Sequence, residues 1–279
     1  MLKIVMDTAG DLGLGWQQEY DINLIPINII HNGISYQQGI DIDYDDFYAL
    51  VEQEGAIPST SQPTPYQFIE FYKKIAQPGD SILSIHVTDK LSGTMASAHQ
   101  AAEELKGEYD IHPFDSASGT ICMGMMCKEA REMSNTGKTI PEILHRLDTI
   151  RDDMQLVFTL ETMKFAQLSG RVKSLQATMA SILDIKPIIE LHDGIIEIKD
   201  KVRSRKASII RMIDLMKSKM GDDPLKIAVV HAHDAFTGEE LLEQVKKTFN
   251  CTEVAFAEIS ISLAAHFGPG TVGLAAYKA

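Results

Sequence analysis

Residues 81–94, with the sequence SILSIHVTDKLSGT, join a short apolar run to a polar loop. The run at 81–87 is bounded by turn residues, which is typical of a buried β-strand. The loop ends in Ser92-Gly93-Thr94, and a stretch at 95–105 with the pattern of a helix follows it. A strand, a polar loop and a helix in this order predict one unit of an α/β fold.

The same alternation extends through the first half of the chain. Residues 2–6 and 109–114 are short apolar runs that we also expect to be buried strands. Thr64-Pro65 and Thr139-x-Pro141 each place a capping residue just before a proline, which predicts the first turn of a helix. This pattern predicts a parallel sheet, in an N-terminal α/β domain that we assign to residues 1–155.

The pattern changes after about residue 155, and we assign residues 156–279 to a second α/β domain. Residues 187–191 and 195–200 predict a β-hairpin, since Asp193-Gly194 supplies the positive φ of a tight turn. A hairpin indicates a mixed sheet. The remaining strands are predicted at 155–160, 227–231 and 254–259, and the helices at 164–169, 172–183 and 238–248.

Charge, cysteines and hydropathy exclude several classes of protein. The net charge of −13 would repel a phosphate backbone, so we expect no nucleic-acid partner. The three cysteines form no Cys-x-x-Cys pair and no even set, which indicates free thiols and a cytoplasmic location. The longest apolar stretch, at 24–30, is broken by Pro26 and Asn28 and is too short for the ~20 residues of a membrane helix.

Polar clusters follow the predicted strands. They lie at residues 7–11, 59–63, 91–94 and 115–118, and they are rich in hydroxyl groups. Ligands of open α/β sheets bind beyond the carboxyl ends of the strands, so these loops can converge on one site. Ser92 stands at a helix start, where free backbone N–H groups favour an anion, although Ser92 or Thr94 can equally serve as a helix cap.

Taken together, these clusters resemble the DegV family, whose characterised bacterial members are the fatty-acid-binding FakB proteins. The resemblance spans nearly the whole chain and depends on the order and spacing of several motifs. These motifs are Asp7-Thr8-x-x-Asp11, Thr60-Ser61-Gln62-Pro63, Leu91-Ser92-Gly93-Thr94, Asp115-Ser116, Leu168-Ser169-Gly170-Arg171, Lys186-Pro187 and His266-Phe267-Gly268-Pro269-Gly270.

The resemblance implies a two-domain DegV-type (EDD) fold that buries one long-chain fatty acid between its domains. It places the carboxylate at a site formed by Thr60 or Ser61, the Ser92-Gly93-Thr94 loop and His266, with Arg171 acting directly or through water. It also implies a partner, a FakA-like fatty acid kinase that phosphorylates the bound carboxylate for phospholipid synthesis. The chain would then be a subunit without catalytic residues, cofactor or metal.

Elementary energetics agree with a buried acyl chain. About 16 methylenes at ~0.8 kcal/mol each give up to ~13 kcal/mol of gross transfer free energy, before ordering costs. The carboxylate needs charge-assisted donors when it leaves water, and hydroxyls and His266 meet that need. Met123, Met125 and Met126, on a helix predicted at 118–133, can line an adaptable pocket, although a Met-rich face is more often plain core.

Basic residues recur at every second position in Lys199, Lys201, Arg203 and Arg205. If the strand continues through them, all four project from one face. We expect Arg203, Arg205 and the adjacent Lys206 to dock an acidic partner or to help steady a transferring phosphate. The alternative is that these residues form a solvated strand edge.

Two motifs in the second half are expected to be decoys. Residues 268–273 match G-x-G-x-x-G, but they precede a strand predicted at 274–277 instead of a helix, so we interpret them as a tight turn that positions His266. His231-Ala232-His233-Asp234 places two histidines on one side of a strand but lacks further ligands, so we expect no metal site.

The rival hypothesis is an enzyme on the same fold, a kinase lobe or a hydrolase in which Ser92 is the nucleophile and His266 the base. The chain contains neither a G-x-S-x-G elbow around Ser92 nor a G-x-x-x-x-G-K-[ST] phosphate loop. A third possibility, an interaction module without a ligand, explains the basic residues but leaves the clustered hydroxyls unexplained.

Overall fold

The computed structural model describes residues 1–54, 57–172 and 185–279. Its first sheet is parallel and has the strand order β2-β1-β6-β7. Its strands are β1 (Leu2–Asp7), β2 (Ile22–Ile25), β6 (Ser81–His86) and β7 (Asp110–Asp115). The predicted parallel sheet is therefore confirmed, and β2 is a strand that the sequence reasoning missed.

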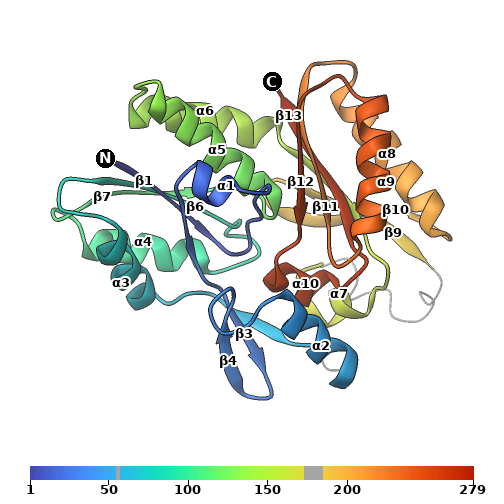
Figure 1. The fold of residues 1–279 in the computed structure, drawn as a ribbon, viewed down its shortest axis with the longest axis horizontal. Helices are drawn as coiled ribbons and strands as arrows, with labels where there is room; N and C mark the ends of the chain where they lie inside the picture. The colour runs from blue at the N-terminus through green and yellow to red at the C-terminus, as the bar shows by residue number, and fades with distance from the viewer. Residues whose placement is uncertain (55–56, 173–184) are drawn as a thin grey trace.

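Helices cover both faces of this sheet (Figure 1). They are α3 (Pro65–Ile75), α4 (Thr94–Glu104), α5 (Ile121–Asn135) and α6 (Ile140–Asp153). One buried cluster joins α3 and α4 to Val5 and Ile82, and another joins α5 and α6 to Ile4 and Leu83. Thr64 caps α3 and Thr139 caps α6, each in a capping box with a proline in the first turn, so both predicted helix starts are confirmed.

The second sheet is mixed and has the order β10-β9-β8-β13-β11-β12. Its strands are β8 (Gln155–Thr159), β9 (Lys186–His192), β10 (Ile195–Val202), β11 (Leu225–His231), β12 (Cys251–Glu258) and β13 (Val272–Lys278). The predicted β9–β10 hairpin is confirmed, and Asp193 and Gly194 have φ of 47° and 72°. α8 (Arg205–Met220) and α9 (Ala235–Thr248) pack on one face.

The other face of the mixed sheet packs against α5 and α6. Leu156 and Phe158 of β8 belong to the same buried cluster as the two helices, whereas Val157 between them faces α8 and α9. This alternation follows from the two-residue period of a strand. The molecule is therefore layered, with α5 and α6 between the two sheets (Figure 1).

A small antiparallel sheet, β4-β3-β5, links the two halves. It consists of β3 (Asn28–His31), β4 (Ile34–Gln37) and β5 (Ser59–Ser61), and α2 (Tyr44–Glu54) follows β4. Ile29 and Phe47 form a buried cluster with Ala264 and Ala265 of α10 (Ile261–Phe267). Two further helices are α1 (Trp16–Glu19) and α7 (Lys164–Ser169).

The basic residues Lys199, Lys201, Arg203 and Arg205 do not all lie on one strand, contrary to the prediction. β10 ends at Val202 and its register shifts between Ile198 and Asp200, so the strand does not continue through Arg205. Arg205 instead begins α8, because the Ser204 hydroxyl accepts a hydrogen bond from the Ala207 N–H and caps that helix.

Two other expectations concern helices. The helix predicted at 172–183 falls almost entirely outside the described residues. Within residues 1–54, 57–172 and 185–279, no helix combines the length and the apolar character needed to cross a membrane.

Candidate functional site

A cavity of about 270 Å³ opens between the two sheets. Its apolar walls come from the mixed sheet, with Leu156, Phe158 and Val230, and from residues such as Ile27 and Val87 on the other side. One water needs a void of only roughly 10–15 Å³, so this space accommodates a ligand of many atoms. Predominantly apolar walls with a few polar groups are typical of a site for a small apolar molecule.

The loops beyond the parallel strands meet at this cavity. Ala9 follows β1, the Leu91-Ser92-Gly93 segment follows β6, and Ser118-Gly119-Thr120 follows β7, and all of these residues line it. The carboxyl ends of the strands lie at one edge of the sheet, which explains the convergence. Asp7 and Asp115 stay outside the lining and instead accept backbone N–H groups, from Ala9 at 2.9 Å and from Ala117 at 2.8 Å.

Thr60 and His266 come together where the polar lining residues of the cavity are partly exposed to solvent, and we call this part of the cavity its mouth. Thr60 Oγ1 and His266 Nε2 share a hydrogen bond of 2.9 Å, although the residues lie on β5 and α10. Burial, together with charge repulsion from the nearby Arg171 guanidinium, lowers the pKa of His266 to about 4. His266 is therefore neutral at pH 7. Ser61 lies beside them, partly exposed.

The Ser92-Gly93-Thr94 loop forms another part of the mouth. Ser92 and Gly93 line the cavity, while Thr94 is buried behind them with its hydroxyl 2.8 Å from Ser92 Oγ. The helix begins at Thr94 with Gly93 as its N-cap, and neither hydroxyl makes the side-chain capping bond of an N-cap residue. A Cβ on Gly93 would lie 2.3 Å from the Gln62 amide, so a larger residue here would displace the Gln62 side chain from this part of the site.

Arg171 also lines the cavity and is exposed at its mouth. It follows α7, whose C-cap Gly170 has φ of 69°, and its guanidinium donates to the Ser169 carbonyl at 2.6 Å. The residues at the mouth thus combine a cation, hydroxyl groups, a neutral imidazole and the N-terminus of α4, a set of donors suited to an anion.

The three methionines proposed for the pocket lie elsewhere. Met123, Met125 and Met126 are at most 3% exposed, belong to the core around α5, and are absent from the cavity lining. The reason is that α5 lies between the two sheets and packs against β1, β6 and β13, so this face is enclosed by the core. The expectation of an acyl-chain lining from these residues was wrong, and the plain-core alternative holds.

Sequence reasoning missed other residues of the cavity. Gln62 belongs to a cluster that was recognised, but its amide was not assigned to the site. Ser262 and Leu263 precede His266 on α10, and Ser262 lies one turn before it. The spacing of four residues that places Ser262 on the face of His266 was the available signal.

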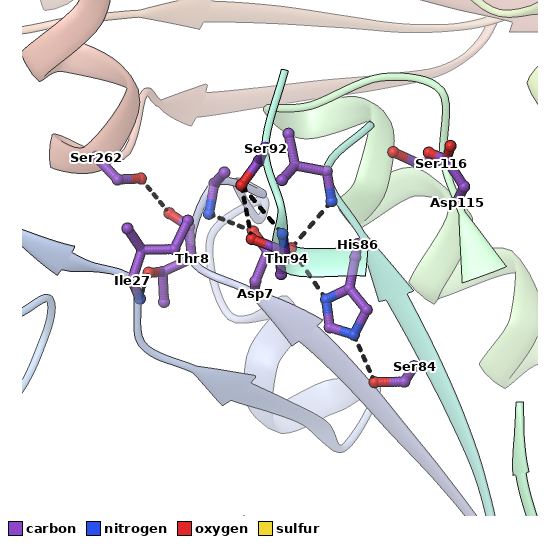
Figure 2. A network of polar contacts seen from close by, with 12 residues as sticks. Asp7, Thr8, Ile27, Ser84, His86, Ser92, Thr94, Asp115, Ser116 and Ser262 are labelled. Carbon is purple, nitrogen blue, oxygen red and sulfur yellow. Dashed lines mark hydrogen bonds and ion pairs between the residues drawn. The ribbon is translucent and has the colours of Figure 1, made fainter. Parts of the chain in front are cut away.

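A buried Asp–His–Ser chain lies beneath the loop after β6. His86 Nδ1 is 3.0 Å from Asp7 Oδ2, and His86 Nε2 is 2.7 Å from Ser84 Oγ (Figure 2). The order resembles that of a hydrolase triad. Tyr72 donates its hydroxyl proton to Ser84 at 2.8 Å, and all four side chains are fully buried, so no substrate can reach the serine.

The arrangement at the mouth does not form a nucleophile and base. Ser92 is paired with Thr94 and His266 with Thr60, and among the described residues no hydrogen bond joins Ser92 to His266. Within that same part of the chain, no three His, Cys, Asp or Glu side chains are grouped to hold a metal ion. His233 stacks on Tyr48 at 4.2 Å, and Asp234 caps α9.

The glycine-rich segment after α10 is a turn, as expected. Gly268 and Gly270 have φ of 81° and 78°, and the segment leads directly into β13. A Cβ on Gly268 would lie 2.5 Å from the Phe165 ring. The turn therefore packs α10 closely against α7, next to Arg171.

Two of the three basic residues proposed for docking are exposed, namely Arg203 and Lys206. Arg205 forms ion pairs within the protein, because its guanidinium lies 3.1 Å from Asp234 Oδ2 and 3.7 Å from Glu161 Oε2. It also donates to the Gly270 carbonyl. The docking role stays a prediction for Arg203 and Lys206, while Arg205 anchors the turn after α10.

Comparisons with known proteins agree with this architecture. The model of the DegV family, described as "Uncharacterised protein, DegV family", matches residues 1–279. A DegV domain-containing protein of Listeria monocytogenes is 30% identical over 280 residues, which cover 99% of this chain and 98% of the relative.

Two solved structures have the same fold. A DegV family protein from Thermus thermophilus, described as fatty acid binding, has a TM-score of 0.91 and 27% identity, covering 100% of this chain and 99% of that chain. DegV of Bacillus subtilis, described as a fatty acid binding protein, has a TM-score of 0.88 and 25% identity with the same coverage. The parallel sheet, the mixed sheet and the full-length family match together show that this chain belongs to the DegV family.

Proposed function

We propose that this protein binds one long-chain fatty acid, with its acyl chain in the cavity and its carboxylate at the mouth. The observation that carries the proposal is the cavity itself, which has apolar walls on two sheets and a polar mouth formed by Thr60, Ser92, Arg171 and His266. The two related structures described as fatty acid binding support it.

Each part of the site has a physical task. Burial of the acyl chain supplies most of the affinity, at ~0.8 kcal/mol for each methylene. Arg171 supplies the positive charge for the carboxylate, while Thr60 or Ser61, Ser92 and the backbone N–H of Gly93 supply hydrogen bonds. The Thr94 N–H donates to Ser92 Oγ at 3.3 Å and holds that hydroxyl in place. His266 is neutral when the site is empty, so it adds a hydrogen bond without a fixed charge.

The carboxylate would then lie where a second protein can reach it. We propose that a FakA-like fatty acid kinase phosphorylates it there for phospholipid synthesis, and that this chain acts as a non-catalytic carrier in the cytoplasm. The free thiols of Cys122, Cys127 and Cys251 agree with a reducing compartment. Arg203 and Lys206 are the exposed cations that we propose for docking.

The first test is native mass spectrometry of the purified protein, followed by denaturation and lipid analysis. We expect one fatty acid per chain. An empty protein that hydrolyses esters or binds ATP without a partner would instead support the enzyme hypothesis.

The second test measures the affinity of the variants Ser92→Ala and His266→Ala for a fluorescent fatty acid. Each variant loses a hydrogen bond to a charged group, which is worth roughly 1.5–3 kcal/mol, so we expect Kd to rise about ten- to hundredfold. Ser218→Ala is the matched control, since its exposed hydroxyl bonds only to the Leu215 carbonyl. Unchanged Kd in both site variants would contradict the proposed head-group site.

A further inference from the structure

The N-terminus of α10 is held by the other half of the chain. Its N-cap, Ser260, makes no side-chain capping bond. The Ser260 N–H donates instead to Asp11 Oδ1 at 2.8 Å, and the Ser262 N–H donates to Gln38 Oε1 at 3.0 Å. The Ser262 hydroxyl donates to the Thr8 carbonyl at 2.8 Å (Figure 2). The position of α10, and of His266 on it, therefore depends on these contacts.

Asp11 also reaches the cavity wall. The Thr120 hydroxyl donates to its second oxygen, Oδ2, and Thr120 itself lines the cavity. Thr120 has a φ of 52°, a left-handed conformation that is unusual for a β-branched residue, and its N–H donates to the Ala9 carbonyl at 2.7 Å. One carboxylate thus connects α10 to the segment that precedes α5.

The surroundings of Asp11 provide no cation. The side chain is 4% exposed, and no ion pair to it occurs within the described part of the chain. The titratable groups that face it are Glu258 at the end of β12, Tyr44 and Tyr48 on α2, and Cys122 on α5. A buried carboxylate without a counter-ion is costly, so its two hydrogen bonds are the main compensation.

We infer that Asp11 is a positioning residue for the fatty-acid head-group site, because it holds α10 in the place that brings His266 to Thr60. This inference rests on the proposed function. Asp11 lies behind the mouth, outside the cavity lining, so it acts through Ser260 and Thr120 and makes no contact with the ligand.

The inference predicts a pH dependence near neutrality. Burial raises the pKa of Asp11 to about 7, against the opposing effect of the hydrogen bonds from Thr120 and Ser260, and Glu258 adds a small upward contribution. Only the ionised form accepts both hydrogen bonds fully, so fatty-acid affinity should fall as the pH drops from 8 to 6. In the empty site His266 has a pKa of about 4 and stays neutral in this range, as a monomeric carboxylic acid with a pKa of roughly 4–5 stays ionised. A rise in the pKa of His266 on binding would tighten binding at lower pH, which is opposite in sign to the effect expected from Asp11.

The experiment compares Asp11→Asn, Asp11→Ala and Thr120→Val with the wild type. Fatty-acid Kd is measured from pH 6 to 8 with a polyene fluorescent fatty acid kept below its micelle concentration. Ser208→Ala is the control, since it removes another buried hydroxyl that bonds only to the Arg205 carbonyl, on the outer side of the mixed sheet.

We expect Kd to rise about tenfold in Asp11→Ala at pH 8. Asp11→Asn keeps an oxygen for Ser260 but cannot titrate, so its Kd should not vary with pH, whereas that of the wild type and of Ser208→Ala should rise several-fold toward pH 6. NMR of the imidazole should show the pKa of His266 returning toward 6.5 in Asp11→Ala, because a displaced α10 exposes the ring.

The outcomes separate the two claims. A wild type that binds no fatty acid would refute the proposed function itself. A wild type that binds, with the same pH profile in Asp11→Asn and the same His266 pKa in Asp11→Ala, would refute the positioning role and leave the carrier function standing. If Asp11→Ala does not fold, Asp11→Asn and Thr120→Val decide the question.

Discussion

Burial and the nearby Arg171 guanidinium both disfavour the protonated form of the His266 imidazole. Its neutral state leaves Nε2 free to share a proton with Thr60 at 2.9 Å. The positive charge at the mouth comes from the Arg171 guanidinium, whose planar donors suit a carboxylate. A carboxylate arriving there would stabilise a protonated imidazole and so raise the pKa of His266.

The lowered pKa of His266 predicts how stability depends on pH. The folded pKa is about 4 and the ordinary value is 6.5, so between these values the unfolded chain binds a proton that the folded chain does not. The free energy of unfolding should therefore fall as the pH drops from 6.5 to 4. Urea denaturation of the empty protein should show a smaller fall for His266→Gln than for the wild type.

His145→Gln is the control for this measurement, because His145 is exposed on α6. The same pH dependence in the wild type and in His266→Gln would contradict the assignment of a neutral, buried imidazole.

At the scale of an element, α5 is fixed by a close approach at Gly124. A Cβ at this position would lie 2.1 Å from the backbone oxygen of Asp11. Gly124→Ala gains up to ~1 kcal/mol of helix propensity, but the clash with backbone should cost more, for a net loss of about 2 kcal/mol in the free energy of unfolding. Thermal and urea denaturation of Gly124→Ala and of the wild type measure this difference in the free energy of unfolding.

Gly238→Ala in α9 is the matched helical control. Its Cβ would meet only side-chain atoms, of His231 and Phe256, at 3.1 Å, and these can move slightly. If Gly124→Ala proves as stable as Gly238→Ala, the close approach of α5 to Asp11 is wrong.

Local signals were sufficient for many elements. The capping boxes at Thr64 and Thr139 identified two helix starts, and Asp193-Gly194 identified the β9–β10 hairpin, because each feature depends on residues next to one another in the chain. The strands predicted at 2–6, 81–87 and 109–114 correspond to β1, β6 and β7. In each case the local preference and the tertiary structure agree.

Elements that depend on distant contacts were missed. α10 has seven residues, and its N-terminus is held by Asp11 and Gln38, more than two hundred positions away. The small sheet contains β5, only three residues long, whose pairing with β3 no local pattern reveals. For the same reason, the sequence indicated which residue types form the mouth but not that Thr60 bonds His266, or that the α5 methionines lie away from the cavity.

At the scale of the whole molecule, a charged cluster joins α5 to the mixed sheet. Glu129 accepts hydrogen bonds from Arg146 Nε at 2.9 Å and from Lys226 Nζ at 2.6 Å, and from the Tyr277 hydroxyl at 3.3 Å. Burial alone would raise the pKa of Glu129, but Lys226 and Arg146 together hold this pKa below its usual range. The carboxylate therefore stabilises the contact between the two halves of the chain.

Glu129→Gln removes the negative charge, so the partly buried Arg146 loses its ion pair and Lys226 keeps only the longer contact with Glu253 Oε2 at 3.9 Å. We expect the free energy of unfolding to fall by about 2 kcal/mol at pH 7. Glu243→Gln, which breaks an exposed pair with Lys246, should leave the free energy of unfolding almost unchanged. Equal effects of both changes, measured by urea denaturation, would show that the cluster does not hold the halves together.

The hydrogen bond between Thr60 and His266 joins positions 206 residues apart. During synthesis on a ribosome, the first strands and helices emerge long before the segment that carries the histidine. A chain that ends before α10 would contain Thr60 and Ser92 but would lack His266. The two side chains can therefore pair only after the segment that carries α10 has left the ribosome.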